Sequence, residues 1–365
     1  MDISNYVANF HFDEKYAAAF ENADISTIDL LTLDISDLEK RTNRNKDELI
    51  QIVQQVFLLL RPKRKVASRI SQSFLTTGDR ILDQKLHGGI PVGQLTEICG
   101  ESGSGKSQLC MQLCLMVQLP RAFGGLNKAA VFISTESGLE TKRLFELAKY
   151  LPDRFPEAEE SDVFIRNPGD RVYTILCPDL ESQEHIIQYQ LPILFERDSI
   201  GLVVLDSVAA NYRAELRYNR SKSHYTDLNN IATRGNQLGK LASILRDLSR
   251  RHEAAVVIAN QVSDRLTRDY GAIGLFSLDY QSQWFNGWDD LDPNPKIPSL
   301  GLVWTNNVNT RLALIKRTDN AAVKARRTLR VVYSPNAARI DVPVFIGSMG
   351  IFVPKEEKDA LNPLL

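Results

Sequence analysis

The sequence predicts an α/β fold with a mostly parallel central sheet, antiparallel C-terminal strands and a small helical domain in front. Three observations lead to this prediction. Short apolar segments alternate with helical patterns from Thr76 onward, a glycine-rich loop joins one such segment to a helix, and apolar residues recur at helical spacing over 10–60. Continuous apolar strands separated by helices are typical of a parallel sheet covered on both faces.

The elements of the α/β part are expected in a fixed order along the chain. Strand and helical patterns alternate through QLTEICG, SQLCMQLCLMVQL, AAVFIS (129–134), TKRLFELAKYL, VYTILCP, HIIQYQLPILFE, IGLVVLD (200–206), a long helix near 229–252 and AAVVIANQ. The last segments, TRLALIKR, TLRVVYSP and FIGSMGIFV, are expected to be antiparallel strands. We therefore predict a helical domain over 1–60, a basic linker over 61–75, an α/β domain over 76–355 and a tail over 356–365.

Composition limits the classes of protein to which the chain can belong. A net charge of −1 excludes a uniformly basic protein, yet residues 211–251 carry nine basic and three acidic side chains, while residues 1–60 carry eleven acidic and five basic ones. The four cysteines lack metal-ligand spacing, so we expect reduced thiols. The sequence shows no signal peptide and no apolar run of membrane-spanning length, which predicts no membrane partner.

The segment GESGSGKS (100–107) fits the phosphate-loop pattern G-x-x-x-x-G-K-[ST] between an apolar strand and a helix. Glycines allow backbone N–H groups to point at phosphate oxygens, and the following helix adds the positive end of its dipole. In this pattern the lysine reaches the β- and γ-phosphates and the hydroxyl binds Mg²⁺. We therefore predict an ATP and Mg²⁺ site formed by Gly100, Glu101, Ser102, Gly103, Ser104, Gly105, Lys106, Ser107 and Gln108.

Polar residues also follow three later strands, where an open parallel sheet binds its ligand. Asp206 suits a magnesium role, with a helix cap as the alternative. Glu136 can orient an attacking water. The alternative is that Glu136 is a residue at the N-terminus of the next helix, where the helix dipole favours a carboxylate. Gln261 can sense the γ-phosphate or be an ordinary polar strand end. Lys106, Glu136 and Gln261 are thus the predicted catalytic residues, and Ser107 and Asp206 the metal-binding ones.

Two basic stretches point to further roles. Arg213, Arg217, Arg220 and Lys222 lie within ten residues, interleaved with Tyr212 and Tyr218. Cations for phosphates and aromatic faces for unstacked bases are what sequence-neutral binding of single-stranded DNA requires. A solvated loop is the alternative. The other stretch, RPKRKV (61–66), fits either a nuclear address or a charged linker.

Taken together, these residues resemble the RecA/RadA recombinase family, and the eukaryotic recombinase paralogues in particular. The resemblance runs from about residue 10 to about residue 353 and is densest in the segment FLTTGDRILDQKLHGGIPVGQLTEICGESGSGKSQLCMQLCLMVQLP and in VFISTESGLETKRL, VVLDSVAANYR and VVIANQV. It implies that residues 76–355 form a RecA-like ATPase domain. Glu136 is then the catalytic glutamate, Gln261 the nucleotide sensor, Arg143 the residue against the adenine and Pro335 a cap residue. The segments 211–234, ending at Arg234, and 262–301 match the family's two DNA-binding loops.

The sequence departs from the family in three places. Residues 61–73 hold no Phe-x-x-Ala motif of the kind that docks a recombinase into its neighbour, so self-assembly into long filaments is in doubt. Residues 40–50 lack the glycine turn of a helix-hairpin-helix, so duplex binding there is in doubt too. The second loop carries Trp284, Trp288, Asp289, Asp290 and Asp292, a composition that suits a protein partner better than phosphates.

Three functional hypotheses follow from the resemblance. In the favoured one, the chain is a nuclear recombination mediator and weak DNA-dependent ATPase that pairs with another paralogue and helps the strand-exchange recombinase to assemble on single-stranded DNA. The alternatives are the strand-exchange recombinase itself and a scaffold that binds ATP without hydrolysing it. The missing docking motif argues against the recombinase, and the intact set of catalytic residues argues against the scaffold. Because the sequence shows no arginine finger of its own, we expect a neighbouring protomer to supply a cation.

Overall fold

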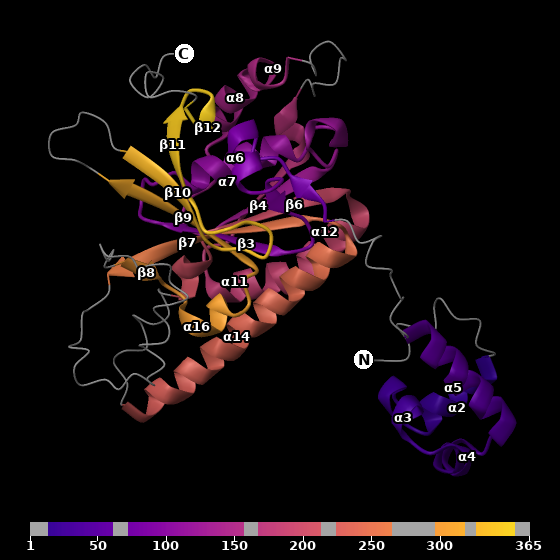
Figure 1. Ribbon diagram of the computed structural model, residues 1–365. Coiled ribbons are helices and arrows are strands. Elements are labelled where there is room, and N and C mark those ends of the chain that lie inside the picture. The colour runs from indigo at the N-terminus through magenta and orange to yellow at the C-terminus, as the bar shows by residue number, and fades with distance from the viewer. Residues whose placement is uncertain are drawn as a thin grey trace. The chain divides into compact units, whose positions relative to one another are not determined.

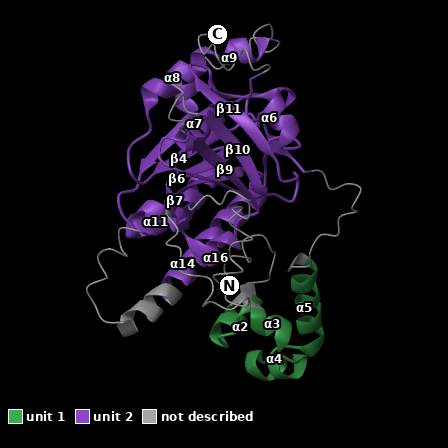
Figure 2. Ribbon diagram, turned by 60° about the vertical axis from the view of Figure 1, so that its left-hand side comes forward, with its two compact units in different colours: residues 1–71 green, residues 72–365 purple. Residues whose placement is uncertain are grey.

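The computed structural model describes residues 14–60, 72–156, 167–212, 224–264, 296–317 and 326–354. The chain forms two compact units, Met1–Ser71 and Gln72–Leu365 (Figure 2). The second unit starts at Gln72 rather than at residue 76, because β1 (Phe74–Leu75) pairs with β2 (Ile90–Pro91) within it. None of the described helices has the length and apolar character needed to cross a membrane.

The first unit is helical, as the sequence predicts. Its described helices are α2 (Glu14–Asn22), α3 (Thr27–Thr32), α4 (Ile35–Thr42) and α5 (Lys46–Leu60). Phe20, Leu30, Leu38 and Leu49 are buried together and form a core of their own. Ser26 begins α3 with a capping box, in which the backbone N–H of Asp29 donates to the Ser26 hydroxyl and the Asp29 carboxylate accepts from the Ser26 backbone.

The second unit is built on a large sheet whose centre is parallel, which confirms the predicted fold class. Within the described residues its strands are β3 (Leu95–Gly100), β4 (Ala129–Ser134), β5 (Val172–Leu176), β6 (Ile200–Asp206), β7 (Ala255–Asp264), β8 (Lys296–Pro298), β9 (Thr310–Arg317), β10 (Arg326–Tyr333), β11 (Asp341–Gly347) and β12 (Gly350–Phe352). They lie in the order β12-β11-β10-β9-β3-β7-β6-β4-β5, with β8 on the end of β7. β3, β4, β5, β6, β7 and β9 are parallel, whereas β8, β10, β11 and β12 run antiparallel to their neighbours.

Helices cover both faces of this sheet (Figure 1). One face packs against α6 (Arg80–Lys85), α7 (Lys106–Met116), α8 (Thr141–Lys149) and α9 (Leu151–Arg154); the other packs against α11 (Leu180–His185), α12 (Leu191–Arg197), α14 (His224–Arg251) and α16 (Gly301–Thr305). The central strands are buried throughout because successive side chains enter opposite cores. Val257 joins the first core and Val256 the second.

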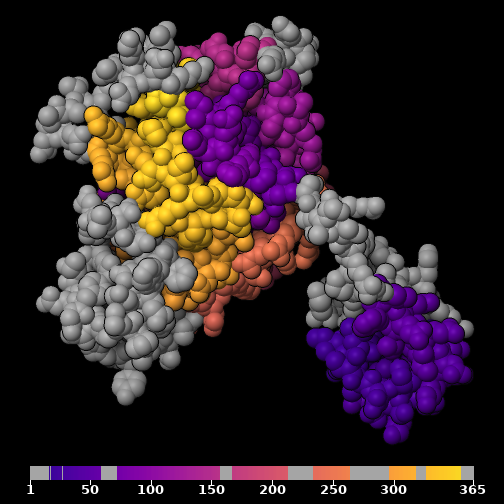
Figure 3. Space-filling view, viewed as in Figure 1, coloured from indigo at the N-terminus to yellow at the C-terminus, as the bar shows by residue number. Residues whose placement is uncertain are grey.

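The C-terminal strands close over the first face. The backbone N–H of Ile351, in β12, donates to the Gln112 side chain of α7 at 2.8 Å, and the same side chain donates back to the Ile351 carbonyl at 3.1 Å. In the space-filling view the yellow C-terminal segment lies directly against the violet start of the unit (Figure 3). β12 is thereby attached to the middle of α7.

Candidate nucleotide-binding site

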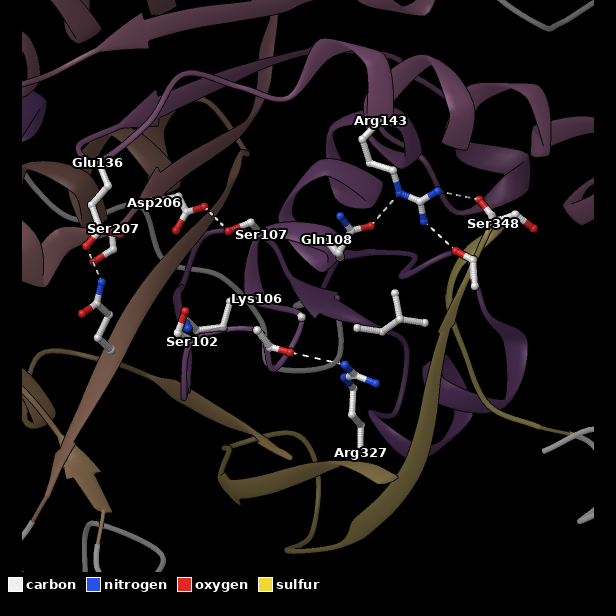
Figure 4. Close-up of a pocket in the computed structure, with 15 residues that line it drawn as sticks. Ser102, Lys106, Ser107, Gln108, Glu136, Arg143, Asp206, Ser207, Arg327 and Ser348 are labelled. Carbon is white, nitrogen blue, oxygen red and sulfur yellow. Dashed lines mark hydrogen bonds between the residues drawn. The ribbon is translucent and has the colours of Figure 1, made fainter. Parts of the chain in front are cut away.

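A cavity of ≈ 760 Å³ opens where β3 meets α7, at the carboxyl ends of β3, β6 and β4 (Figure 4). Because β3, β7, β6 and β4 are neighbours in that order, the polar residues that end these strands meet at one edge of the sheet. The cavity is lined by Ser102, Gly103, Gly105, Lys106, Ser107, Gln108, Glu136, Arg143, Asp206, Ser207, Gln261, Arg327, Ile346, Gly347 and Ser348. The cavity therefore brings together most of the residues that the sequence predicts for the nucleotide site, but its lining does not include Gly100, Glu101, Ser104 or Pro335.

The loop before α7 has the backbone of a phosphate cradle. Gly103 and Gly105 have φ angles of +70° and +116°, a region that residues with a Cβ rarely enter. A Cβ at Gly105 would also lie 2.5 Å from Cδ1 of Ile346. The two glycines let the loop turn tightly into the helix N-terminus, where N–H groups without helical partners favour an anion.

Lys106 lies at the centre of this cradle. Its ammonium donates to the carbonyl oxygens of Gly100 and Glu101, both at 2.9 Å. Burial lowers the pKa of Lys106, and the nearby Asp206 carboxylate opposes that shift. Gly100, Glu101 and Ser104 do not line the cavity themselves, but the first two anchor the lysine there.

Ser107 and Asp206 meet as the predicted metal-binding pair. The Ser107 hydroxyl donates to the Asp206 carboxylate at 2.6 Å. Burial raises the pKa of Asp206, although the Ser107 hydrogen bond and Lys106 act in the opposite direction. Ser207 Oγ, beside them, is buried and makes no hydrogen bond within the described part of the chain. One carboxylate and one hydroxyl suit Mg²⁺, which keeps water and phosphate oxygens as its other ligands.

Glu136 and Gln261 are also brought together, although β6 separates their strands. The Gln261 amide donates to the Glu136 carboxylate at the mouth of the cavity. Gln261 is also connected with the end of β8, because the hydroxyl of Ser299, the residue after β8, donates to the Gln261 carbonyl oxygen at 2.6 Å. Lys296, at the start of β8, forms an ion pair of 3.0 Å with Glu101 in the phosphate loop. Gln261 and Glu101 thus connect the nucleotide site with β7 and β8, the strands that flank residues 265–295.

Arg143 lies at the far end of the cavity. Its guanidinium donates to Gln108 Oε1 at 2.9 Å and to the carbonyl oxygen of Gly347, the last residue of β11, at 2.6 Å. Arg143 therefore lies at the end of the cavity away from Asp206 and Glu136 (Figure 4). An arginine that contacts the base would lie at this end.

Pro335, by contrast, is not part of this cavity. It is exposed and follows β10, which runs antiparallel to β9. The carboxyl end of β10 consequently lies at the opposite edge of the sheet, beside Thr310 at the start of β9. The cap residue expected from the resemblance therefore does not reach the chain's own nucleotide site.

The predicted DNA-binding residues Arg213, Arg217, Arg220 and Lys222 lie outside the described residues. Arg234, in α14, is half-buried; its Cζ lies 5.7 Å from the centre of the Tyr212 ring, and burial lowers its pKa. Tyr212 itself is only 1% exposed. The expectation that its ring stacks on a base is wrong, because that ring is part of the protein core.

Several cavity residues were not predicted from the sequence, namely Ser207, Arg327, Ile346, Gly347 and Ser348. Ser207 directly follows Asp206 at the end of β6, so it could have been predicted on the same ground as Asp206. The others come from β10, the end of β11 and the turn after it, and no sequence motif includes them. Their location depends on the direction in which the C-terminal strands run.

Comparison with known proteins agrees with this geometry. The family model described as Rad51 matches residues 68–353. The chain is 74% identical over 352 residues to "DNA repair protein rhp57" of Schizosaccharomyces pombe, covering 96% of this chain and 99% of that protein. It is 35% identical to "DNA repair protein RAD57" of Saccharomyces cerevisiae, over 76% of this chain and 60% of that protein. It is 32% identical to "DNA repair protein XRCC3" of Mus musculus, over 72% of this chain and 70% of that protein.

The matched range contains the phosphate loop, the strand ends around it and the C-terminal strands that close the cavity. The resemblance stated from the motifs is thereby confirmed: the chain belongs to the Rad51 family.

Proposed function

We propose that this chain is a DNA repair protein of homologous recombination, an ATP-binding recombinase paralogue that acts as a mediator. The observation that carries the proposal is the convergence of Lys106, the Ser107–Asp206 pair and the Glu136–Gln261 pair on one cavity. The relatives named DNA repair proteins supply the pathway. The absence of a Phe-x-x-Ala motif from residues 61–73 favours a mediator over a self-assembling recombinase.

The proposed chemistry is attack by water on the γ-phosphate of ATP. Lys106 and the loop amides bind the phosphates, and the Ser107–Asp206 pair would hold Mg²⁺, which neutralises phosphate charge when bound. Glu136 orients the water and accepts its proton, while the Gln261 amide fixes the direction of the carboxylate. Gln261 also connects that carboxylate with Ser299, so the state of the nucleotide can affect the β8 region.

The nucleotide role is tested by substitutions at the two ends of this arrangement. Lys106→Ala should abolish ATP binding in calorimetry, because the buried cation for the β- and γ-phosphates is lost. Glu136→Gln should preserve binding and slow hydrolysis about 10²-fold or more, since positioned acid–base groups contribute that much. Lys142→Ala, which removes an exposed lysine outside the cavity, is the matched control. Equal ATP affinity in wild type and Lys106→Ala would contradict the assignment, and turnover unaffected by Glu136→Gln would favour the scaffold.

The partner, the DNA and the compartment are the finer parts of the proposal. We propose a nuclear heterodimer with another paralogue that promotes recombinase assembly on single-stranded DNA. Isolation of the chain from nuclear extract, followed by identification of the stoichiometric partner, tests this directly. A different paralogue supports the mediator, whereas long homopolymers of this chain would support the recombinase.

A further inference from the structure

One wall of the cavity is formed by backbone rather than by motif residues. It belongs to the closing segment, residues 347–351, which spans the end of β11, the turn after it and the start of β12. Gly347 and Ser348 line the cavity from this segment, at the end that holds Arg143 and away from Asp206 (Figure 4). The phosphates of a nucleotide bind at the loop and the metal-binding pair, so its nucleoside extends toward the closing segment.

Two arginine side chains hold the closing segment by its carbonyl oxygens. Arg143 donates to the first two of these oxygens, at 2.6 Å and 3.2 Å. Arg154, the last residue of α9, donates through Nη2 to the carbonyl oxygens of Met349 and Ile351, at 2.7 Å and 3.0 Å. Four of the five carbonyl oxygens of the closing segment therefore accept a hydrogen bond from a guanidinium.

Arg154 also connects the closing segment with the start of the unit. Its Nη1 donates to the carbonyl oxygen of Gly78, just before α6, at 3.0 Å. The backbone N–H of Gly78 donates to the Thr76 hydroxyl at 3.0 Å, so this acceptor is itself held in place. Burial lowers the pKa of Arg154 to about 10, while Asp79 and Asp83 act in the opposite direction. The guanidinium therefore stays charged at neutral pH.

The position of Arg154 separates it from the residues that touch a ligand. Arg154 is not among the residues that line the cavity, so it acts on the nucleotide through the closing segment. A guanidinium is a planar fork, and its donors hold several acceptors at fixed distances from one another. A wall that is held in place before the ligand arrives need not be ordered on binding, which favours affinity.

We propose that Arg154 is a positioning residue for the nucleoside part of ATP: it fixes the closing segment as the wall against which the ribose and base bind. This inference rests on the proposed nucleotide-binding function and adds a residue to that site. Arg143 contacts the closing segment from within the cavity lining, whereas Arg154 contacts it from outside that lining. Gln112 also holds Ile351, so β12 stays attached to α7 when Arg154 is replaced.

The first measurement compares ATPγS with inorganic tripolyphosphate, which presents phosphates without a nucleoside. Calorimetry on the full chain with Mg²⁺ gives both affinities. Arg154→Met removes every donor and keeps an unbranched side chain. It should weaken ATPγS binding roughly three- to tenfold, because the closing segment must then be ordered on binding, and leave tripolyphosphate binding within about twofold. Arg154→Lys should recover part of the loss, since an ammonium can still donate to the carbonyl oxygens.

The second measurement follows the closing segment itself by hydrogen exchange without nucleotide. The backbone N–H of Ile351 should exchange faster in Arg154→Met than in wild type, while exchange in the phosphate loop stays the same. Arg171→Met is the matched control in both measurements. Arg171 likewise donates to a backbone carbonyl oxygen, that of Asn127 at 2.9 Å, but it does not line the cavity or contact the closing segment.

The possible outcomes are separable. If Arg154→Met leaves ATPγS affinity unchanged, weakens both ligands equally or leaves the exchange of Ile351 unchanged, the role of Arg154 is overturned while the proposed function stands. If the wild-type chain does not bind ATPγS, both are overturned. If tripolyphosphate binds too weakly to measure, ATPγS affinity and exchange decide together. Thermal unfolding of each variant shows whether the fold is intact, and the comparison of two ligands within one variant is independent of the folded fraction.

Discussion

At the scale of single residues, Asp206 links the metal site to pH. Because burial raises the pKa of Asp206, the folded protein takes up a proton there at a higher pH than an ordinary aspartate does. The proton and Mg²⁺ compete for the same carboxylate, so Mg²⁺-dependent ATP binding should weaken as the pH falls toward that pKa. Calorimetric titrations between about pH 7.5 and pH 5 check this. In Asp206→Asn, the same change in pH should cause a smaller loss, and an equal loss would contradict the prediction.

Another residue-scale feature is the buried ion pair between Glu97 and Arg311, both 0% exposed. Glu97 also accepts from Asn260 at 2.6 Å and from Trp304 at 2.9 Å, so it joins β3, β7 and α16. Burial on its own lowers the pKa of Arg311, but the Glu97 carboxylate outweighs it and the pKa is raised. The guanidinium therefore stays charged, and its removal leaves Glu97 with an uncompensated charge.

We predict that Arg311→Met lowers the free energy of unfolding by about 3–5 kcal/mol, as expected when one partner of a buried pair is lost. Urea denaturation measures this. The double variant Glu97→Gln with Arg311→Met should be less destabilised than Arg311→Met alone, since no buried charge remains. A double variant that is as unstable as the sum of both single variants would show that the pair is not coupled.

At the scale of elements, the helix starts of the first unit allow a matched comparison. The Ser26 hydroxyl accepts from the Asp29 backbone at the start of α3, whereas Asp34 begins α4 without a side-chain capping bond. Ser26→Ala should lower the free energy of unfolding of this unit by about 1 kcal/mol, the usual effect of losing a cap. Asp34→Ala should lower this free energy of unfolding by a smaller amount, because no capping bond is lost. Chemical denaturation monitored by circular dichroism measures both, and a larger loss for Asp34→Ala would be the contrary result.

Most elements were predictable from periodicity, and the exceptions have physical reasons. The strands AAVFIS and IGLVVLD were predicted with the bounds that β4 and β6 have, because both are apolar runs, buried over all of β4 and over β6 up to its last residue. HIIQYQLPILFE was predicted as one helix, but the structure has a π-helical stretch at Ile186–Gln190 before α12. Pro192 lacks the N–H that a regular α-helix needs there. The short β8 and α16 carry too little pattern to be seen.

The candidate site shows the same limit. Lys106, Glu136, Asp206 and Gln261 were predictable, because a parallel sheet brings the ends of its strands together whatever the packing between them. Arg327 and the turn at Gly347 were not, since their location depends on the order and direction of the antiparallel strands. Tyr212 was assigned to a DNA loop because of its basic neighbours, yet its burial follows from the core beneath it.

At the scale of the whole molecule, the two units have separate cores, and the described residues that line the nucleotide cavity all come from the second. Leu38→Ala should therefore destabilise the first unit by about 2–5 kcal/mol, the range for a buried leucine, and leave ATP affinity unchanged. Hydrogen exchange locates the loss, and calorimetry measures the affinity. A parallel loss of ATP binding would show that the units depend on each other.

The contacts of Gln261 with Glu136 and of Lys296 with Glu101 attach both flanks of residues 265–295 to the nucleotide site. Thermodynamic linkage makes such a connection reciprocal. If a molecule binds this segment and its binding shifts either contact, it changes the affinity of the chain for ATP by some factor. ATP must then change the affinity of the chain for that molecule by the same factor. Nucleotide titrations with and without a candidate ligand can therefore detect what the segment recognises, even when that ligand never touches a phosphate.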